Sequence, residues 1–66
     1  MDKVNFVRKG DLIEIHLGEK IVKVAGHLDS DCFRIFTESF ETSSLTDQER
    51  EIVRKELQHR NDIIID

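Results

Sequence analysis

Two of the three histidines and the single cysteine, His16, His27 and Cys32, have the side chains best suited to chemistry. Imidazole nitrogen and thiolate sulfur are common zinc ligands, and Asp31 would add a carboxylate oxygen. A histidine beside a cysteine can also lower the pKa of the thiol and make it nucleophilic. Either chemistry requires the surrounding strands to bring these residues together.

Turn-forming residues divide the first part of the chain, about residues 3–38, into four short strands. Gly18-Glu19 is typical of a two-residue type II′ hairpin turn, and a hairpin closed there places Ile15 opposite Val22. Side chains alternate between the two faces of a strand, so this pairing also assigns each residue of the hairpin to a face.

Two further turn signals flank this hairpin. A loop at Lys9-Gly10 pairs Arg8 with Asp11, and a loop at Asp29-Ser30 places the ring of Phe33 beside a strand glycine. All three turns put the large aliphatic residues on one face, which we expect to form the core. That face carries Val4, Phe6, Ile13, Ile15, Val22, Val24, Phe33 and Ile35.

The period of the apolar pattern changes after residue 38. Thr46 and Glu49 have the spacing of a capping box, in which the side chain of each residue accepts from the backbone N–H of the other. We expect an amphipathic helix over about residues 46–60 that ends at Asn61 and packs on the core face of the sheet. Its apolar stripe consists of Leu45, Ile52, Val53 and Leu57.

These elements predict a single domain, residues 1–66, of the α+β class. It has two layers, a four-stranded antiparallel β-meander and one C-terminal helix packed on one face of the sheet. The apolar tail, residues 61–66, contains Ile63, Ile64 and Ile65. These isoleucines would dock on the rim of the core, add an edge strand or contact another chain, and simple docking is our expectation.

The same register argues against a metal centre. It places His27 directly opposite Cys32, but His16 lies about 20 Å away along the sheet, too far to share a zinc ion with them. No serine lies in a nucleophile elbow, and there is no glycine-rich phosphate loop. We therefore expect neither an enzyme nor a cofactor, and an uncharacterised small enzyme or a metal site is only a remote alternative.

The face that the helix does not need carries the best functional signal. By alternation it holds Asn5, Val7, Leu12, Glu14, His16, Ile21, Lys23, Ala25, His27, Cys32, Arg34 and Phe36. A sheet face turned to water should be mainly polar, whereas this face has an apolar strip edged by charge. We expect a protein-interaction face made of Val7, Leu12, Ile21, Lys23, Arg34 and Phe36, with Ile63, Ile64 and Ile65 of the tail as an additional contact.

Two kinds of partner fit this face. The first is a protein, either a second copy of the chain or a different molecule. The second is single-stranded RNA, with Phe36 stacked on a base while Lys23, Arg34, His16 and His27 contact phosphates. The protein is favoured because the net charge is −4 and because Glu14 lies in the middle of the face. Residues 38–66 supply this net charge, with four basic and eight acidic side chains.

Length and composition fit such a binding role. A chain of 66 residues buries only about 60% of the surface that it exposes when unfolded, so its stability is marginal and a partner would help. The lone thiol, the lack of a signal peptide and the lack of an apolar run long enough to span a bilayer favour the cytoplasm. We therefore expect a small acidic binding protein with an accessory or regulatory role, of a kind common in bacteria and phages. If the protein associates with itself, it would form a homodimer.

Overall fold

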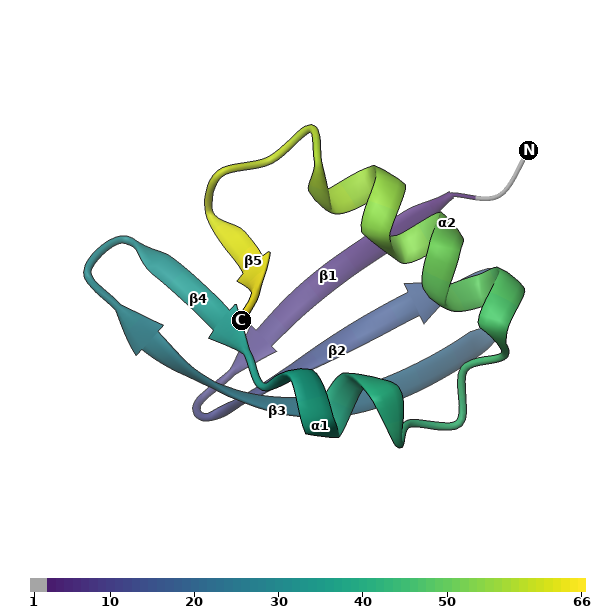
Figure 1. The fold of residues 1–66 in the computed structure, drawn as a ribbon, viewed down its shortest axis with the longest axis horizontal. Helices are drawn as coiled ribbons and strands as arrows, with labels where there is room; N and C mark the ends of the chain where they lie inside the picture. Colours follow the sequence, from purple (N-terminus) through teal and green to yellow (C-terminus); the bar gives the residue numbers. More distant parts are fainter. Residues whose placement is uncertain (1–2) are drawn as a thin grey trace.

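The computed structural model describes residues 3–66 as a curled five-stranded sheet, in the order β1-β2-β3-β4-β5, with two helices (Figure 1). The strands are β1 (Val4–Lys9), β2 (Leu12–Leu17), β3 (Lys20–Asp29), β4 (Cys32–Ile35) and β5 (Ile63–Ile65). The helices are α1 (Thr37–Glu41) and α2 (Asp47–Leu57). The predicted α+β class and the antiparallel order of the first four strands are confirmed, but the sequence analysis lacked one strand and one helix.

The β2–β3 hairpin has the register that its turn predicts. Leu17 pairs with Lys20, and Ile15 pairs with Val22. Gly18 opens the turn with a φ of +62°, in the left-handed region that glycine enters without a steric cost. A positive φ at the first turn position fits the type II′ turn expected from Gly18-Glu19.

The loop of the β1–β2 hairpin lies one residue later than predicted, which shifts the cross-strand partners by two residues. The loop is Gly10-Asp11, so that Lys9 pairs with Leu12 and Val7 with Glu14. The expected pairing of Arg8 with Asp11 is therefore wrong. The assignment of side chains to faces survives, because a shift of two residues preserves the alternation along each strand.

The β3–β4 hairpin shows the same two-residue shift. Its turn lies at Ser30-Asp31, where Ser30 has a φ of +57°, and Asp29 pairs with Cys32. Phe33 nevertheless packs against Gly26, since a Cβ atom at that glycine would lie 2.5 Å from Cε1 of the ring. The expected contact between the ring and the strand glycine is thus present in spite of the changed register.

Helix α1 is a five-residue element that the sequence analysis missed. Its N-cap residue Phe36 makes no side-chain capping bond, so the usual capping signal is absent from the sequence. The helix places Phe40 in the core, and its Ser39 hydroxyl accepts from the backbone N–H of Ala25 at 2.8 Å. The backbone N–H of Phe36 donates to the Ala25 carbonyl at 3.0 Å. These two bonds continue the pairing of β3 beyond the end of β4.

Helix α2 begins with the predicted capping box. The Thr46 hydroxyl accepts from the backbone N–H of Glu49 at 3.1 Å, and the Glu49 carboxylate accepts from the backbone N–H of Thr46 at 2.9 Å. The same carboxylate oxygen accepts from Lys20 Nζ at 2.8 Å, which ties the start of the helix to the β2–β3 hairpin. The helix ends at Leu57 rather than at residue 60.

Strand β5 pairs with β4 in parallel, aligning Phe33 with Ile63 and Ile35 with Ile65. The tail is therefore an edge strand, and the expectation of simple docking is wrong. Ile63 is nevertheless buried in the core, and Ile65 packs against it. The helical segment between β4 and β5 allows the parallel return, because parallel strands need a long crossover connection.

The core lies between the inner face of the sheet and the two helices. Phe6, which the sequence analysis assigned to this core, is only half-buried, and the Arg60 guanidinium lies 5.1 Å from its ring centroid. The predicted stripe of α2 is confirmed at Val53 and Leu57. The buried cluster consists of Val4, Ile13, Ile15, Leu17, Val22, Val24, Phe33, Ile35, Phe40, Leu45, Val53, Leu57 and Ile63.

Candidate functional site

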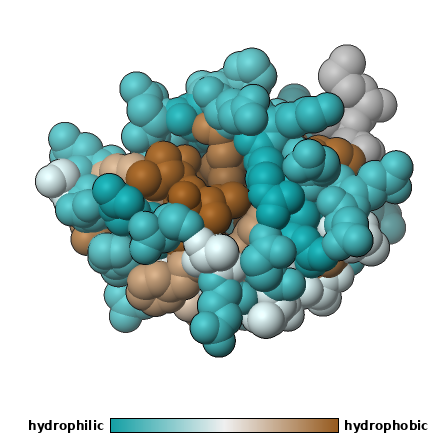
Figure 2. Space-filling view, viewed as in Figure 1, coloured by the Kyte–Doolittle hydropathy of each residue, from teal (hydrophilic) through white to brown (hydrophobic). Residues whose placement is uncertain are grey.

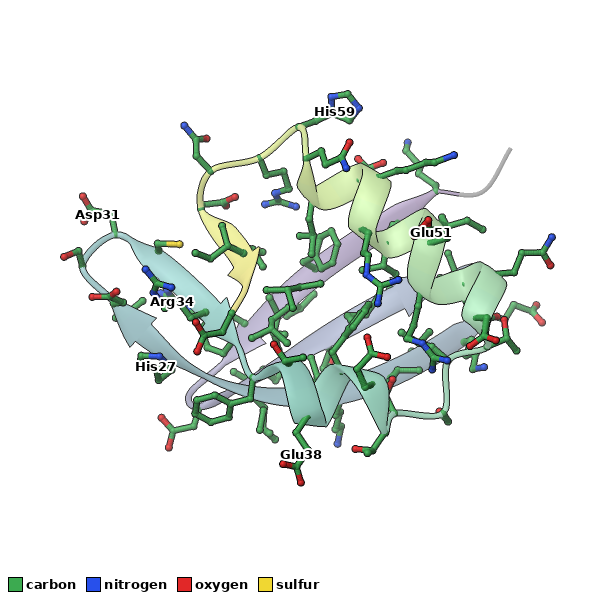
Figure 3. The ribbon with its side chains drawn as sticks, viewed as in Figure 1. His27, Asp31, Arg34, Glu38, Glu51 and His59 are labelled. Atoms are coloured by element: carbon green, nitrogen blue, oxygen red, sulfur yellow. The ribbon has the colours of Figure 1, made fainter. Side chains whose placement is uncertain are left out.

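The structure separates the residues that the sequence singled out for chemistry. His27 pairs with Arg34, whereas Cys32 pairs with Asp29, so the predicted juxtaposition of His27 and Cys32 is wrong. In Figure 3, His27 lies on the β3–β4 hairpin and His59 lies beyond the end of α2. Within residues 3–66, no three histidine, cysteine, aspartate or glutamate side chains lie close enough together to hold a metal ion.

The outer face of the sheet carries several apolar side chains in contact with water. Leu12 is 40% exposed and Phe36 is 43% exposed. Leu12 is the cross-strand partner of Ala25, whose carbonyl accepts from the Phe36 N–H, so these three residues form one row across β2, β3 and the end of β4. Val7 extends the row diagonally on β1. We call Val7, Leu12, Ala25 and Phe36 the outer row.

Ile21 is the predicted contact that the structure does not bring into this row. It pairs with His16 and lies on the far side of Lys23 along β3. It is also the most exposed of the predicted apolar residues, at 56%. The face therefore has an apolar row at one end, a charged middle and a single isoleucine at the other end.

Two expected neighbours within the row are different. The turns predicted from the sequence would pair Val7 with Leu12 and place Phe36 beside Lys23. In the structure Val7 lies opposite Glu14, and Phe36 lies beside Ala25. Both differences follow from the two-residue shifts of the outer hairpins. Because each shift preserves the faces, the apolar residues still gather on the outer side.

Phe36 is fixed at its end of the row by a neighbour from β3. The rings of His27 and Phe36 stack with their centroids 5.4 Å apart and an interplanar angle of 18°. One face of the Phe36 ring is thus covered by protein. This stacking places a rigid aromatic group beside Ala25, which is a favourable arrangement for a contact surface because little side-chain freedom remains to be lost.

Arg34 lies at the same end, but it is already engaged. Its Nε donates to Asp29 at 2.8 Å, and its Nη1 donates to Asp66 at 3.3 Å (Figure 3). The hydrogen bond that Arg34 donates to Asp29, with the charges of both carboxylates, raises the pKa of Arg34 above its usual value. The guanidinium therefore joins the β3–β4 hairpin to the end of β5, and it is a positioned rather than a free cation.

Glu14 gives the middle of the face its negative charge. A hydrogen bond of 3.1 Å with His16 lowers the pKa of this carboxyl, and the charges of Lys9 and Lys23 act in the same direction. The carboxylate is thus held ionised and surrounded by three nitrogen-bearing side chains. Among residues 3–66, no carboxylate lies within 4.0 Å of Lys23 Nζ, although its charge acts on Glu14 across the strand pair. Lys23 therefore forms no close ion pair of its own on this face.

Neither Phe40 nor the isoleucine tail lies over the outer row. Phe40 is buried beneath α1 in the core, and Ile63 belongs to the same cluster. Ile64 is the only isoleucine of the tail on the outer side, as the neighbour of Arg34. The outer row is accordingly left in contact with water.

One further large apolar side chain is exposed outside the outer row. Leu28 lies in β3 on the same side as Val22 and Val24, but it is 57% exposed. The pairing of β2 with β3 ends at Ala25, so no residue of β2 lies beside Leu28.

No protein-family model matches this chain, and neither a curated protein nor a solved structure matches it. Within residues 3–66, neither helix is long and apolar enough to cross a membrane.

Proposed function

We propose that this chain is a small non-enzymatic binding protein that docks on a protein partner through the outer face of its sheet. The observation that carries the proposal is the outer row, in which Leu12 and Phe36, on either side of Ala25, each expose about two fifths of their surface. An apolar group with a rigid aromatic side chain and a polar surround is the composition of a protein-binding centre. A reducing cytoplasm fits Cys32, which has no second cysteine to pair with.

The charges on this face indicate what kind of partner would bind it. Lys23 lies two residues from Ala25 on the same strand and the same side, without a carboxylate of its own within ion-pair distance. A partner that places a carboxylate there and an apolar patch over the outer row would satisfy both groups. We therefore propose a different protein with an acidic rim as the occupant, rather than a second copy.

Single-stranded RNA is the weaker alternative on this face. His27 covers one side of the Phe36 ring, which leaves only the other side for a base. Glu14 remains ionised in the middle of the face and would repel a phosphate. Among the groups that RNA would need for its phosphates, Arg34 is already held by two aspartates and His16 is hydrogen-bonded to Glu14.

The test compares two leucines of the same sheet. Leu12→Asp changes the outer row, whereas Leu28→Asp introduces the same charge at an exposed position outside it. Each variant and the wild-type protein are titrated by calorimetry with the purified partner that the wild-type protein binds. We expect Leu12→Asp to weaken the complex by about 2 kcal/mol or more, roughly thirtyfold in Kd, and Leu28→Asp to change it little.

Three results would overturn the proposal. Equal losses for both variants would show that the partner binds elsewhere. Sedimentation that depends on protein concentration and is abolished by Leu12→Asp would identify a second copy as the occupant. An electrophoretic shift of single-stranded RNA that disappears at about 200 mM salt would instead support nucleic-acid binding.

A further inference from the structure

A second surface of the molecule is a groove between the C-terminal part of α2 and strand β5. It has a volume of about 280 Å³ and is lined by Arg54, Leu57, Gln58 and all three isoleucines of β5. Figure 2 shows an apolar patch on this side, where Figure 1 places β5 and the neighbouring end of α2. The groove is therefore open to water and mainly apolar.

The backbone of β5 has one paired edge and one unpaired edge. The Asp62 carbonyl accepts from the Phe33 N–H at 2.8 Å, and the Asp66 N–H donates to the Ile35 carbonyl at 2.9 Å. Because backbone groups alternate in direction along a strand, the N–H and C=O groups of Ile63 and Ile65 point away from β4.

The structure shows no protein partner for these outward groups. Within residues 3–66, no hydrogen bond from another backbone group or from a side chain reaches Ile63 or Ile65 on that edge. Two donors and two acceptors are thus presented in the spacing of a strand. An edge of this kind is a template for the addition of another strand.

The groove supplies the side-chain part of the same site. Ile63 and Ile65 turn toward the core, and Leu57 of α2 forms the wall above them. A strand laid along β5 would direct every second side chain toward these apolar groups and the others toward the side of Ile64. Backbone pairing and an apolar slot together are the features of peptide recognition by strand addition.

We propose that the open edge of β5 binds an extended segment of another protein, which joins the sheet as a further strand and inserts apolar side chains into the groove. A second copy is a poor occupant. Two β5 strands could pair in antiparallel so that the outward N–H and C=O groups of Ile63 and Ile65 are all bonded. This pairing sets Ile64 of one copy opposite Ile64 of the other. It would set Asp62 of one copy opposite Asp66 of the other, and like charges directly opposite each other are destabilising.

The test measures amide hydrogen exchange, by NMR, in the full chain. The probe is a synthetic peptide, acetyl-Thr-Val-Thr-Val-Thr-amide, whose backbone can pair with β5. When the peptide is at ten times its Kd, exchange at the Ile63 and Ile65 amides should slow about tenfold. The Ile64 amide, which faces β4, is the internal reference and should not change.

A proline variant separates strand addition from other binding. Ile65→Pro removes an outward N–H but no hydrogen bond within the protein, and proline is tolerated on the open side of an edge strand. We expect Ile65→Pro to remain folded and to lose the peptide-dependent protection of Ile63. Ile65→Val, which keeps the N–H, should retain it.

Several outcomes would overturn this inference. One is that the Ile63 and Ile65 amides of the free protein already exchange as slowly as Ile64, since the edge would then be covered. Protection that grows with protein concentration alone would identify a second copy. Saturation with the peptide without protection at Ile63 and Ile65, or equal protection in Ile65→Pro, would exclude pairing along this edge. None of these results affects the outer row, so the proposed function would stand or fall separately.

Discussion

The two faces of the sheet are built from the same strands, and yet they have opposite environments. On the inner face, Ile13, Ile15 and Val24 are completely buried. On the outer face, Leu12 and Phe36 are 40% and 43% exposed. Leu12 and Ile13 are neighbours in the chain, so local sequence alone does not set their difference in burial.

The difference arises from segments that come later in the chain. Phe40 from α1, together with Val53 and Leu57 from α2, completes the inner layer. No described segment lies over the outer row in the same way. The comparison teaches that alternation assigns residues to faces, whereas the amphipathic helices decide which face becomes the core. The other face is then available for a partner.

The largest effect is expected from a truncation on the inner face. Ile15→Ala should lower the free energy of unfolding by about 2–5 kcal/mol, because it removes buried methyl groups and leaves a cavity. Leu12→Ala, at the exposed end of the same strand, should change it by less than about 0.5 kcal/mol. Urea denaturation of both variants measures the contrast. Equal losses of stability would mean that the outer row is covered, and the comparison of faces would fail.

The second largest loss of stability is expected at Gly26, where the inner face has no room for a side chain. Gly26→Ala should cost about 1–3 kcal/mol, because a new Cβ would overlap the Phe33 ring and the carbonyl of Arg34. Ala25→Gly on the outer face is the control, and it should cost about 1 kcal/mol or less. Thermal unfolding of both variants tests the order. A milder Gly26→Ala variant would show that the ring can move aside.

The reliability of sequence reasoning differs between these regions for a physical reason. The β2–β3 hairpin was predicted in full because Gly18 was assigned to the first turn position, where its φ is +62°. The other two loops were misplaced by one residue, because Gly10 and Ser30 were assigned to the second turn position and lie at the first, which shifts the cross-strand partners by two residues. Faces survive such a shift, so the core and the outer face were predictable even where the cross-strand partners were not.

The parts that were missed depend on distant contacts. Helix α1 has only five residues and no side-chain cap, so neither its period nor its start is visible in the sequence. Ile63–Ile65 had three plausible environments, and pairing with β4 selected one of them. The apolar outer face could therefore be predicted from alternation, whereas the open edge of β5 and its groove could not.

A smaller effect is expected at the helix that closes the inner layer. Thr46→Ala should reduce stability by about 1 kcal/mol, because it leaves the Glu49 N–H without its capping acceptor. Thr42→Ala, which removes a hydroxyl donor to the Glu38 carbonyl after the short helix, should cost less than about 0.5 kcal/mol. Chemical denaturation compares the two threonines. If Thr42→Ala lowered the stability more than Thr46→Ala, α1 rather than α2 would contribute more to the stability of the layer that packs on the sheet.

The dependence of the unfolding free energy on acidic pH can be compared for one carboxylate on each side of the molecule. The hydrogen bond from Lys20 lowers the pKa of Glu49, and the hydrogen bond from His16 lowers the pKa of Glu14. Each lowered pKa contributes stability that is present above the unfolded value, near 4.5, and is lost as the pH falls through the folded pKa. Glu49→Gln and Glu14→Gln should each make the unfolding free energy less dependent on pH below this value. An unchanged acid dependence in Glu49→Gln would contradict the anchoring of α2 by Lys20.

The smallest effect on stability is expected at Ile21, and it defines the extent of the binding surface. Ile21→Ser should change the unfolding free energy by less than about 0.5 kcal/mol, since the side chain is 56% exposed. Lys23 separates this residue from the outer row, so its loss should weaken partner binding by less than about 1 kcal/mol, below the hot-spot range. Calorimetry with the same partner used for Leu12→Asp gives the comparison. If Ile21→Ser instead weakened binding as strongly as Leu12→Asp, the contact would run the whole length of β3, with Lys23 at its centre rather than on its rim.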